Sequence, residues 1–137
     1  MFKKLKLIAF FAVALWLMQC SDRTPRRISA QMTTDNWKVG WYQEDIANQT
    51  LHYTNYVFTF ADDGSVSANN GTQTVVGTWA TGLDNSDTKF YLNFGADPIF
   101  DELNENWDVL ENSDNLLKLT HVGNSSGSTD FLNFERN

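Results

Sequence analysis

The sequence predicts an all-β fold, an eight-stranded antiparallel up-and-down barrel, and three observations lead to it. Short segments alternate apolar and polar residues with a period of two, which is the pattern of strands with one buried face. The connections between them are short and rich in Asn, Asp and Gly, the residues that tight hairpin turns require. The chain of 137 residues is the size of one domain, and the 15 aromatic residues from residue 35 onward give that domain a substantial core.

The alternating segments place eight strands between residue 35 and the C-terminus. They lie near residues 37–42, 56–60, 66–69, 72–80, 89–94, 107–110, 116–122 and 131–134. In the first strand, Trp37, Val39 and Trp41 are expected to share one face. Residues 82–87 are expected to form a polar loop. Closure into a barrel removes the sheet edges that invite pairing with other chains.

Residues 97–105 interrupt the strand pattern and predict one short helix. Asp97 is a candidate N-cap, and Pro98 suits the first helical position. Ile99 and Leu103 are four residues apart and therefore share a face. A helix between the fifth and sixth strands would cover one end of the barrel.

The first 19 residues have the composition of a secretion signal. Three lysines precede an unbroken run of twelve apolar residues, which is too short to cross a bilayer. The run ends at Leu17-Met18-Gln19-Cys20, which resembles the signal of bacterial lipoproteins. In that family, cleavage precedes a cysteine that carries acyl chains of the palmitate class. We therefore expect a lipoprotein signal peptide at residues 1–19 and lipidation at Cys20; the alternatives are an uncleaved membrane anchor and cleavage at a conventional signal-peptidase site.

Residues 20–34 are interpreted as the lipidated cysteine and a flexible tether, because their polar residues show no apolar period. The arginines of this segment would favour an anionic lipid surface; the alternative is a solvated spacer without further role. Removing residues 1–19, which carry three lysines and no carboxylate, changes the net charge from −7 to −10. The barrel domain is expected to span residues 35–137.

Several segments of this domain resemble the small lipocalin-like lipoproteins of Bacteroidetes. They are Asn36-Trp37-Lys38-Val39, Tyr56-Val57-Phe58-Thr59-Phe60 with Asp63-Gly64, Gly77-Thr78-Trp79, and 101–110. The resemblance covers most of the domain and implies a calycin-type barrel. It implies no particular ligand, because fold alone does not determine function.

Composition argues against several functions. A single cysteine excludes a disulfide framework and multi-cysteine metal sites, and the negative net charge argues against nucleic acid as a partner. His52 and His121 lie on different segments without an acidic neighbour in sequence, and no phosphate-binding or nucleophile motif is present. We therefore expect no enzyme, no catalytic residue, no cofactor and no metal site. The acidic clusters near residues 84–87 and 97–105 indicate a solvated anionic surface, with calcium binding as the alternative.

An eight-stranded barrel either fills its interior with side chains or holds one small ligand, and the sequence leaves both open. The candidate walls of a ligand cavity are Trp41, Tyr56, Phe58, Phe90 and Trp107. The first hypothesis is a monomeric lipoprotein of the bacterial cell envelope, in the outer membrane, whose barrel binds a small apolar or amphipathic ligand. The second is a protein-interaction or structural module with a filled barrel, held at the membrane by its lipid.

Overall fold

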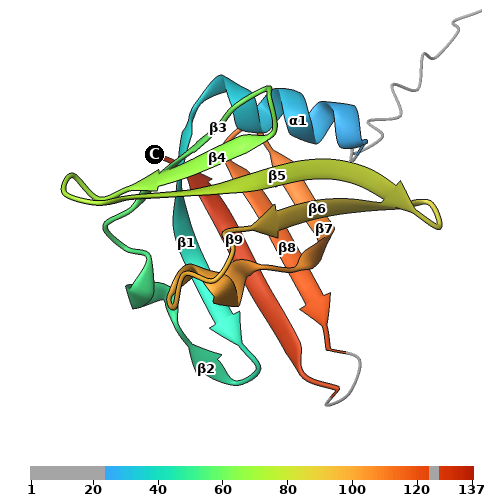
Figure 1. Cartoon of the computed structure of the whole chain (residues 1–137). Helices are drawn as coiled ribbons and strands as arrows, with labels where there is room; N and C mark the ends of the chain where they lie inside the picture. The colour runs from blue at the N-terminus through green and yellow to red at the C-terminus, as the bar shows by residue number, and fades with distance from the viewer. Residues whose placement is uncertain (1–23, 124–126) are drawn as a thin grey trace, which may run out of the picture.

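The described residues of the computed structural model are 24–123 and 127–137, and they form a closed antiparallel barrel (Figure 1). The predicted signal peptide and the predicted lipidation site Cys20 lie outside them. Neighbouring strands follow the order β2-β1-β3-β4-β5-β6-β7-β8-β9, and pairing of β1 with β9 closes the sheet. The elements are α1 Pro25–Thr34, β1 Asn36–Glu44, β2 Ala47–Asn48, the 3₁₀ turn η1 Thr50–His52, β3 Val57–Phe60, β4 Ser65–Asn69, β5 Thr74–Asp84, β6 Asp87–Asn93, the 3₁₀ turn η2 Phe100–Leu103, β7 Asn106–Ser113, β8 Leu116–Val122 and β9 Thr129–Arg136.

The predicted eight-stranded up-and-down barrel is confirmed. All eight expected strands are present, and each pairs antiparallel with its neighbours. The strand β2 adds a two-residue pairing to the end of β1. From β3 to β9 each strand pairs with the next one in the chain, while β1 pairs with β2, β3 and β9. The longest connections contain η1 and η2.

A β-bulge at Gly40 changes which face of β1 each residue occupies. Val39 pairs with Phe134 and Trp41 pairs with the adjacent Asn133, so Gly40 is an extra residue on β1. Before the bulge Trp37 and Val39 face the core; after it Tyr42 does, and Trp41 is 40% exposed on the outside. The predicted common face of Trp37, Val39 and Trp41 is therefore wrong for Trp41.

The expected loop at residues 82–87 is also shorter than predicted. β5 continues to Asp84 and β6 begins at Asp87, so two residues make the turn. Asn85 and Ser86 adopt positive φ angles of 48° and 74°. Two consecutive residues with positive φ give the turn whose twist matches that of the flanking strands, so both strands extend to it.

The predicted flexible tether is wrong for Pro25–Thr34, which forms the helix α1. Thr24 caps this helix by accepting a hydrogen bond from the backbone N–H of Arg27, and Pro25 occupies its first turn. Ile28 and Met32 lie one turn apart and are fully buried. The folded body therefore includes α1 as well as the strands that follow residue 35. None of the helices in the two described ranges has the length and hydropathy that crossing a lipid bilayer requires.

The helix α1 closes one end of the barrel, which we call the α1 end (Figure 1). The Met32 carbonyl accepts a hydrogen bond from the indole of Trp37 at 3.1 Å. The Ser29 and Thr81 hydroxyls lie 2.7 Å apart, which fixes the helix against β5. Apolar burial and these hydrogen bonds make α1 a packed part of the fold.

The helix predicted near residues 97–105 is confirmed as the single 3₁₀ turn η2. The Asp97 carboxylate accepts hydrogen bonds from the backbone N–H groups of Ile99 and Phe100, at 2.9 and 3.0 Å. Phe100 and Leu103 are buried, so η2 closes the opposite end of the barrel as expected. We call this the distal end and define it as residues 44–56 and 95–105.

Replacing Ile28 by Ala tests whether α1 is part of the fold. Truncating a fully buried aliphatic side chain should cost about 2–4 kcal/mol of unfolding free energy, measured by urea denaturation. Arg26→Ala, on the exposed face of the same helix, should stay within about 0.5 kcal/mol of wild type. Equal stability of the two variants would contradict the packing of α1.

Candidate functional site

The barrel interior, where a ligand cavity was one of two expectations, is filled by aromatic side chains. Phe58 lies 5.2 Å from Phe134, and Phe134 lies 5.4 Å from Phe60, measured between ring centroids. Phe60 in turn contacts Trp79 at 5.3 Å and Phe90 at 5.7 Å. Most of these pairs are edge-to-face, the arrangement that the aromatic quadrupole favours.

The same rings continue into the distal end. Phe100 of η2 contacts Phe94, Tyr56 and Tyr53 at 5.0, 4.9 and 5.3 Å. Tyr53 then contacts Tyr42 at 5.5 Å. Rings in contact therefore extend from the distal end through the centre of the barrel. A side chain that lined a water-sized void would keep accessible surface, yet the central rings have none or almost none.

Four of the five predicted cavity residues face inward. Phe58, Phe90 and Trp107 are completely buried, and Tyr56 packs against the core at the distal end. The fifth, Trp41, is outside because of the bulge at Gly40. The structure therefore brings these aromatic residues into the interior, where they pack on their neighbours. Their role in ligand binding stays a prediction.

Buried tryptophans connect the core to the segments that close the barrel. The Trp107 indole donates to the carbonyl of Leu103 at 3.0 Å, at the end of η2. The Trp79 indole donates to the carbonyl of Ala61 at 2.9 Å, in the turn between β3 and β4. Each buried N–H group thus has a backbone acceptor, as burial requires.

Two tyrosines hold the distal end together through their hydroxyl groups. Tyr53 donates to the Ile99 carbonyl at 2.8 Å and lies 3.2 Å from the Glu102 carboxylate. Tyr42 donates to the Glu102 carbonyl at 3.2 Å. Burial, and then the charge of Glu102, raises the pKa of Tyr53; burial, and then Glu44, raises that of Tyr42. Both phenols therefore remain protonated donors at neutral pH.

The two histidines each meet a carboxylate that the sequence spacing did not reveal. His52 Nδ1 lies 3.3 Å from Glu102, and His121 Nε2 lies 3.2 Å from Glu105. The β7–β8 hairpin brings His121 to Glu105, whereas His52 meets Glu102 where η1 approaches η2. Within residues 24–123 and 127–137, no three His, Cys, Asp or Glu side chains converge closely enough to hold a metal ion.

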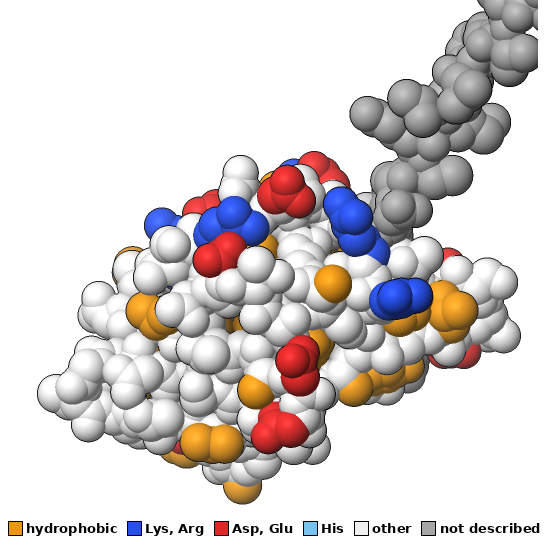
Figure 2. All heavy atoms as spheres, turned by 90° about the horizontal axis from the view of Figure 1, so that it is seen from above, with side chains coloured by type: hydrophobic (Ala, Val, Ile, Leu, Met, Phe, Trp, Pro, Cys, Tyr) orange, Lys and Arg blue, Asp and Glu red, His pale blue; other side chains and the backbone are white. Residues whose placement is uncertain are grey.

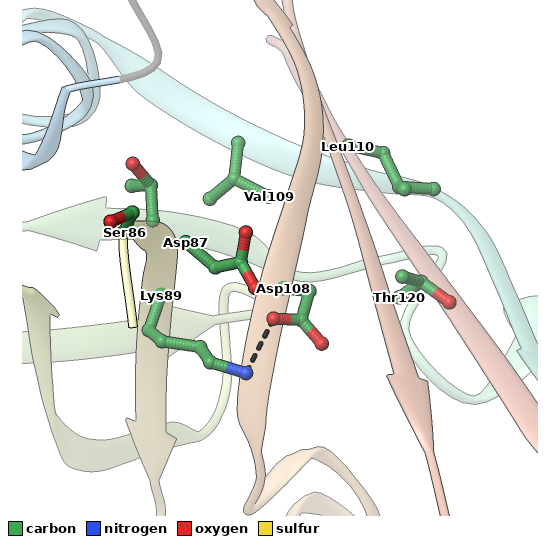
Figure 3. A pocket seen from close by; sticks show the side chains of 8 residues that line it. Ser86, Asp87, Lys89, Asp108, Val109, Leu110 and Thr120 are labelled. Atoms are coloured by element: carbon green, nitrogen blue, oxygen red, sulfur yellow. Dashed lines mark ion pairs between the residues drawn. The ribbon is translucent and has the colours of Figure 1, made fainter. Parts of the chain in front are cut away.

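A polar pocket of about 530 Å³ opens on the outer surface between β6 and β7 (Figure 3). It exists because these strands pair over only three residue pairs and then separate. Lys89 and Asp108 point toward each other across the strands and form an ion pair, and this hydrogen bond raises the pKa of the lysine. Most of the lining is polar, with Val109 and Leu110 as its aliphatic members. It does not have the apolar walls expected of a site for an apolar ligand.

The distal end exposes three large aliphatic side chains. One of them, Ile99, was expected to share a face with Leu103; this is wrong, because Leu103 is buried in η2 whereas Ile99 precedes the turn and is partly exposed. Ile46 in the turn between β1 and β2 is 90% exposed, and Leu51 in η1 is 87% exposed. Ile99, whose carbonyl accepts a hydrogen bond from the Tyr53 hydroxyl, is 43% exposed. Their positions in the sequence could have indicated exposure, because all three lie outside the alternating strand pattern. Ile46 lies in a polar turn, Leu51 lies in η1, and Ile99 precedes η2. We call Ile46, Leu51 and Ile99 the distal apolar set.

The closed antiparallel barrel with packed ends is a lipocalin-like fold. Comparison with solved structures agrees with this. The chain is similar to a DUF4847 family protein from Bacteroides vulgatus, with 17% identity, a TM-score of 0.53, and coverage of 80% of this chain and 97% of that one. It is also similar to a lipocalin-like protein from Bacteroides uniformis, with 16% identity, a TM-score of 0.50, and coverage of 78% and 99%. At these identities the likeness concerns the fold.

Comparisons of sequence give no further assignment. No protein-family model matches the chain, and no curated protein matches it significantly. The names of the two structural neighbours describe a family or a fold and state no enzymatic activity.

Phe90→Ala tests whether the interior is solid. Removing this buried ring should cost about 3–5 kcal/mol of stability and leave an apolar cavity that takes up xenon, as detected by ¹²⁹Xe NMR. The wild type should show no saturable uptake. Val76→Ala, which changes an exposed side chain on β5, is the control. Equal xenon uptake by wild type and Phe90→Ala would show that a cavity already exists.

Proposed function

We propose that this protein is a lipoprotein of the bacterial outer membrane whose filled lipocalin-like barrel is a monomeric, non-enzymatic protein-interaction module. A lipid at Cys20 holds it at the membrane. The observation that carries the proposal is the filled interior, because a barrel without room for a ligand has only its outer surface for recognition. This favours the interaction module over the carrier of small apolar molecules.

The distance between the proposed anchor and the barrel is short. The helix α1 belongs to the folded body, so the N-cap Thr24 is only four positions after Cys20 in the sequence. Fully extended, these four positions span about 14 Å. The α1 end therefore stays next to the lipid surface, and the distal end points away from it (Figure 1).

The distal apolar set has the chemistry of a surface for a protein partner. Large aliphatic side chains that remain exposed on an ordered turn mark interaction sites. Hydrogen bonds within the distal end, such as that between the Thr50 hydroxyl and the Tyr42 carbonyl, fix these turns before binding and so reduce the entropy cost of association.

The charges around this set define the partner further. The distal end carries Glu44, Asp45, Asp97, Asp101, Glu102 and Glu105, and it contains neither Lys nor Arg. Repulsion among such carboxylates contributes to the raised pKa of Glu44, after burial, which is the larger cause. An apolar surface bordered by Lys and Arg would complement this end in shape and charge.

Cys20→Ala tests the anchor. Without the thiol no acyl chain can be attached, so the full-length protein should move from the membrane to the soluble fraction of cells expressing it. Ser21→Ala, the neighbouring change, should remain in the membrane fraction. Retention of Cys20→Ala in membranes after a high-salt wash would contradict lipid anchoring.

The double variant Ile46→Ser with Leu51→Ser tests the interaction surface. Cross-linking in cells followed by purification should recover a partner with the wild type and lose it with this variant, because two exposed anchors are removed. Val76→Ser with Leu83→Ser, which alters two exposed aliphatics on β5, is the matched control and should retain it. The purified pair should dissociate with increasing salt.

Two results would contradict the interaction module. One is a partner lost equally from both double variants, which would place the contact elsewhere or reflect loss of folding. The other is a reproducible extra mass on the purified barrel in native mass spectrometry, which would support the carrier of a small ligand.

A further inference from the structure

A second pocket, of about 220 Å³, lies at the α1 end, where α1, the turn between β7 and β8 and the end of β9 meet. Its lining residues are Arg27, Ala30, Gln31, Thr34, Asp114 and Arg136. Two arginines and one aspartate thus line a common space outside the distal end and outside the barrel interior.

Hydrogen bonds between the three elements build this pocket. Gln31 of α1 donates to the Leu116 carbonyl at 3.1 Å, which ties the helix to the start of β8. The backbone N–H of Arg136 donates to the Asn115 carbonyl at 3.0 Å, which ties β9 to the same turn. The Asp35 carboxylate lies 3.1 Å from Arg136 Nε and orients that side chain. This contact uses one of five guanidinium N–H donors, so others remain for a ligand.

The combination of charges matches a zwitterionic group. Guanidinium groups recognise phosphate oxygens through several parallel hydrogen bonds. A carboxylate in the same pocket attracts an ammonium group. We propose that this pocket binds the phosphoethanolamine headgroup of a membrane lipid, with the phosphate at Arg27 and Arg136 and the ammonium at Asp114, and so holds the α1 end flat on the membrane.

This inference rests on the proposed lipid anchor at Cys20, which would bring the pocket close to the membrane. The anchor keeps Thr24, which precedes the first residue of α1, within about 14 Å of the lipid surface. The distribution of cations agrees: Arg26, Arg27, Lys38 and Arg136 belong to α1 or to the ends of β1 and β9 beside it, whereas the distal end contains no Lys or Arg. Figure 2, which shows the α1 end, has Lys and Arg side chains interspersed with Asp and Glu.

We expect Asp114 to determine which lipid headgroup binds most tightly. A phosphocholine group has the same phosphate, but its quaternary nitrogen carries no N–H group to donate to Asp114. A headgroup with a phosphate and no amine would place an uncompensated negative charge beside Asp114. Both should therefore bind more weakly than phosphoethanolamine, because each forgoes one of the two charge-assisted contacts.

The test begins with the soluble headgroup. The chain from Cys20 to Asn137, which contains every described residue and carries Cys20→Ser, is titrated with glycerophosphoethanolamine and followed by ¹H–¹⁵N NMR. Saturable shifts are expected at Arg27, Gln31, Asp114 and Arg136. Glycerophosphocholine and inorganic phosphate should bind about tenfold more weakly, as the loss of one charged hydrogen bond implies.

Two pocket variants and two control variants test whether binding depends on the pocket residues. Arg27→Gln should weaken binding of the phosphoethanolamine compound about tenfold, and Asp114→Asn should abolish its advantage over the phosphocholine compound. Arg26→Gln and Asp62→Asn, exposed changes that leave the pocket lining intact, should behave as wild type. No shift in the pocket, or equal binding of inorganic phosphate, would overturn the proposal.

A membrane arm separates the headgroup from a free ligand. The protein is coupled through Cys20, its single cysteine, to a maleimide lipid in phosphatidylcholine vesicles with or without phosphatidylethanolamine. Hydrogen exchange in residues 25–34 and 113–116 should slow when phosphatidylethanolamine is present, and Arg27→Gln should remove the difference. Identical exchange in both vesicles would overturn the proposal. Because the coupling is chemical, this outcome is independent of whether Cys20→Ala releases the protein in cells.

Discussion

The filling of the barrel by contacting aromatic rings is the constraint on which the rest of this structure depends. An eight-stranded barrel has an interior of roughly the width that side chains can fill. Here Phe58, Phe60, Phe90 and Phe134 occupy that width from opposite walls, each in contact with at least one other. Rings bury more apolar surface per residue than aliphatic side chains. A short-stranded barrel can therefore obtain a stable core from few inward positions.

The two ends of the barrel depend on the same packing. Indole N–H groups cannot be buried without acceptors, and here the carbonyls of Met32 and Leu103 supply them. These carbonyls belong to α1 and η2, the segments that close opposite ends. The buried tryptophans thus fix where the closing segments sit, and the closing segments in turn exclude water from the rings. The aromatic packing in the interior and the closing segments at the two ends therefore stabilise each other. With the interior filled, the outer surface is the part of the barrel available to bind a partner.

The strands and η2 could be predicted from the sequence because each depends on residues that are close together in the chain. Alternation over five or more residues defines a strand, and Asp97 followed by Pro98 starts a helical turn without help from distant residues. Placement of Trp41 could not be read in this way, since a bulge at Gly40 depends on the pairing of β1 with β9, almost a hundred residues away. The helix α1 gave a weak local signal, because only Ile28 and Met32 are apolar on its buried face. The meeting of Arg27, Asp114 and Arg136 depends on the pairing of β8 with β9 and on the packing of α1 against them, which no local pattern predicts.

Folding of the barrel also determines at which end each charged residue lies. Carboxylates are spread along the whole chain, so net charge by itself distinguishes no face. Once the barrel forms, Arg27 and Arg136 meet at the α1 end while the acidic turns of the distal end gather opposite them. A membrane anchor just before α1 would then turn Arg27 and Arg136 toward lipid phosphates and leave the distal apolar set exposed to other proteins. This orientation depends on the packing of α1 against the barrel. A flexible tether of fourteen residues in its place would let either end face the membrane.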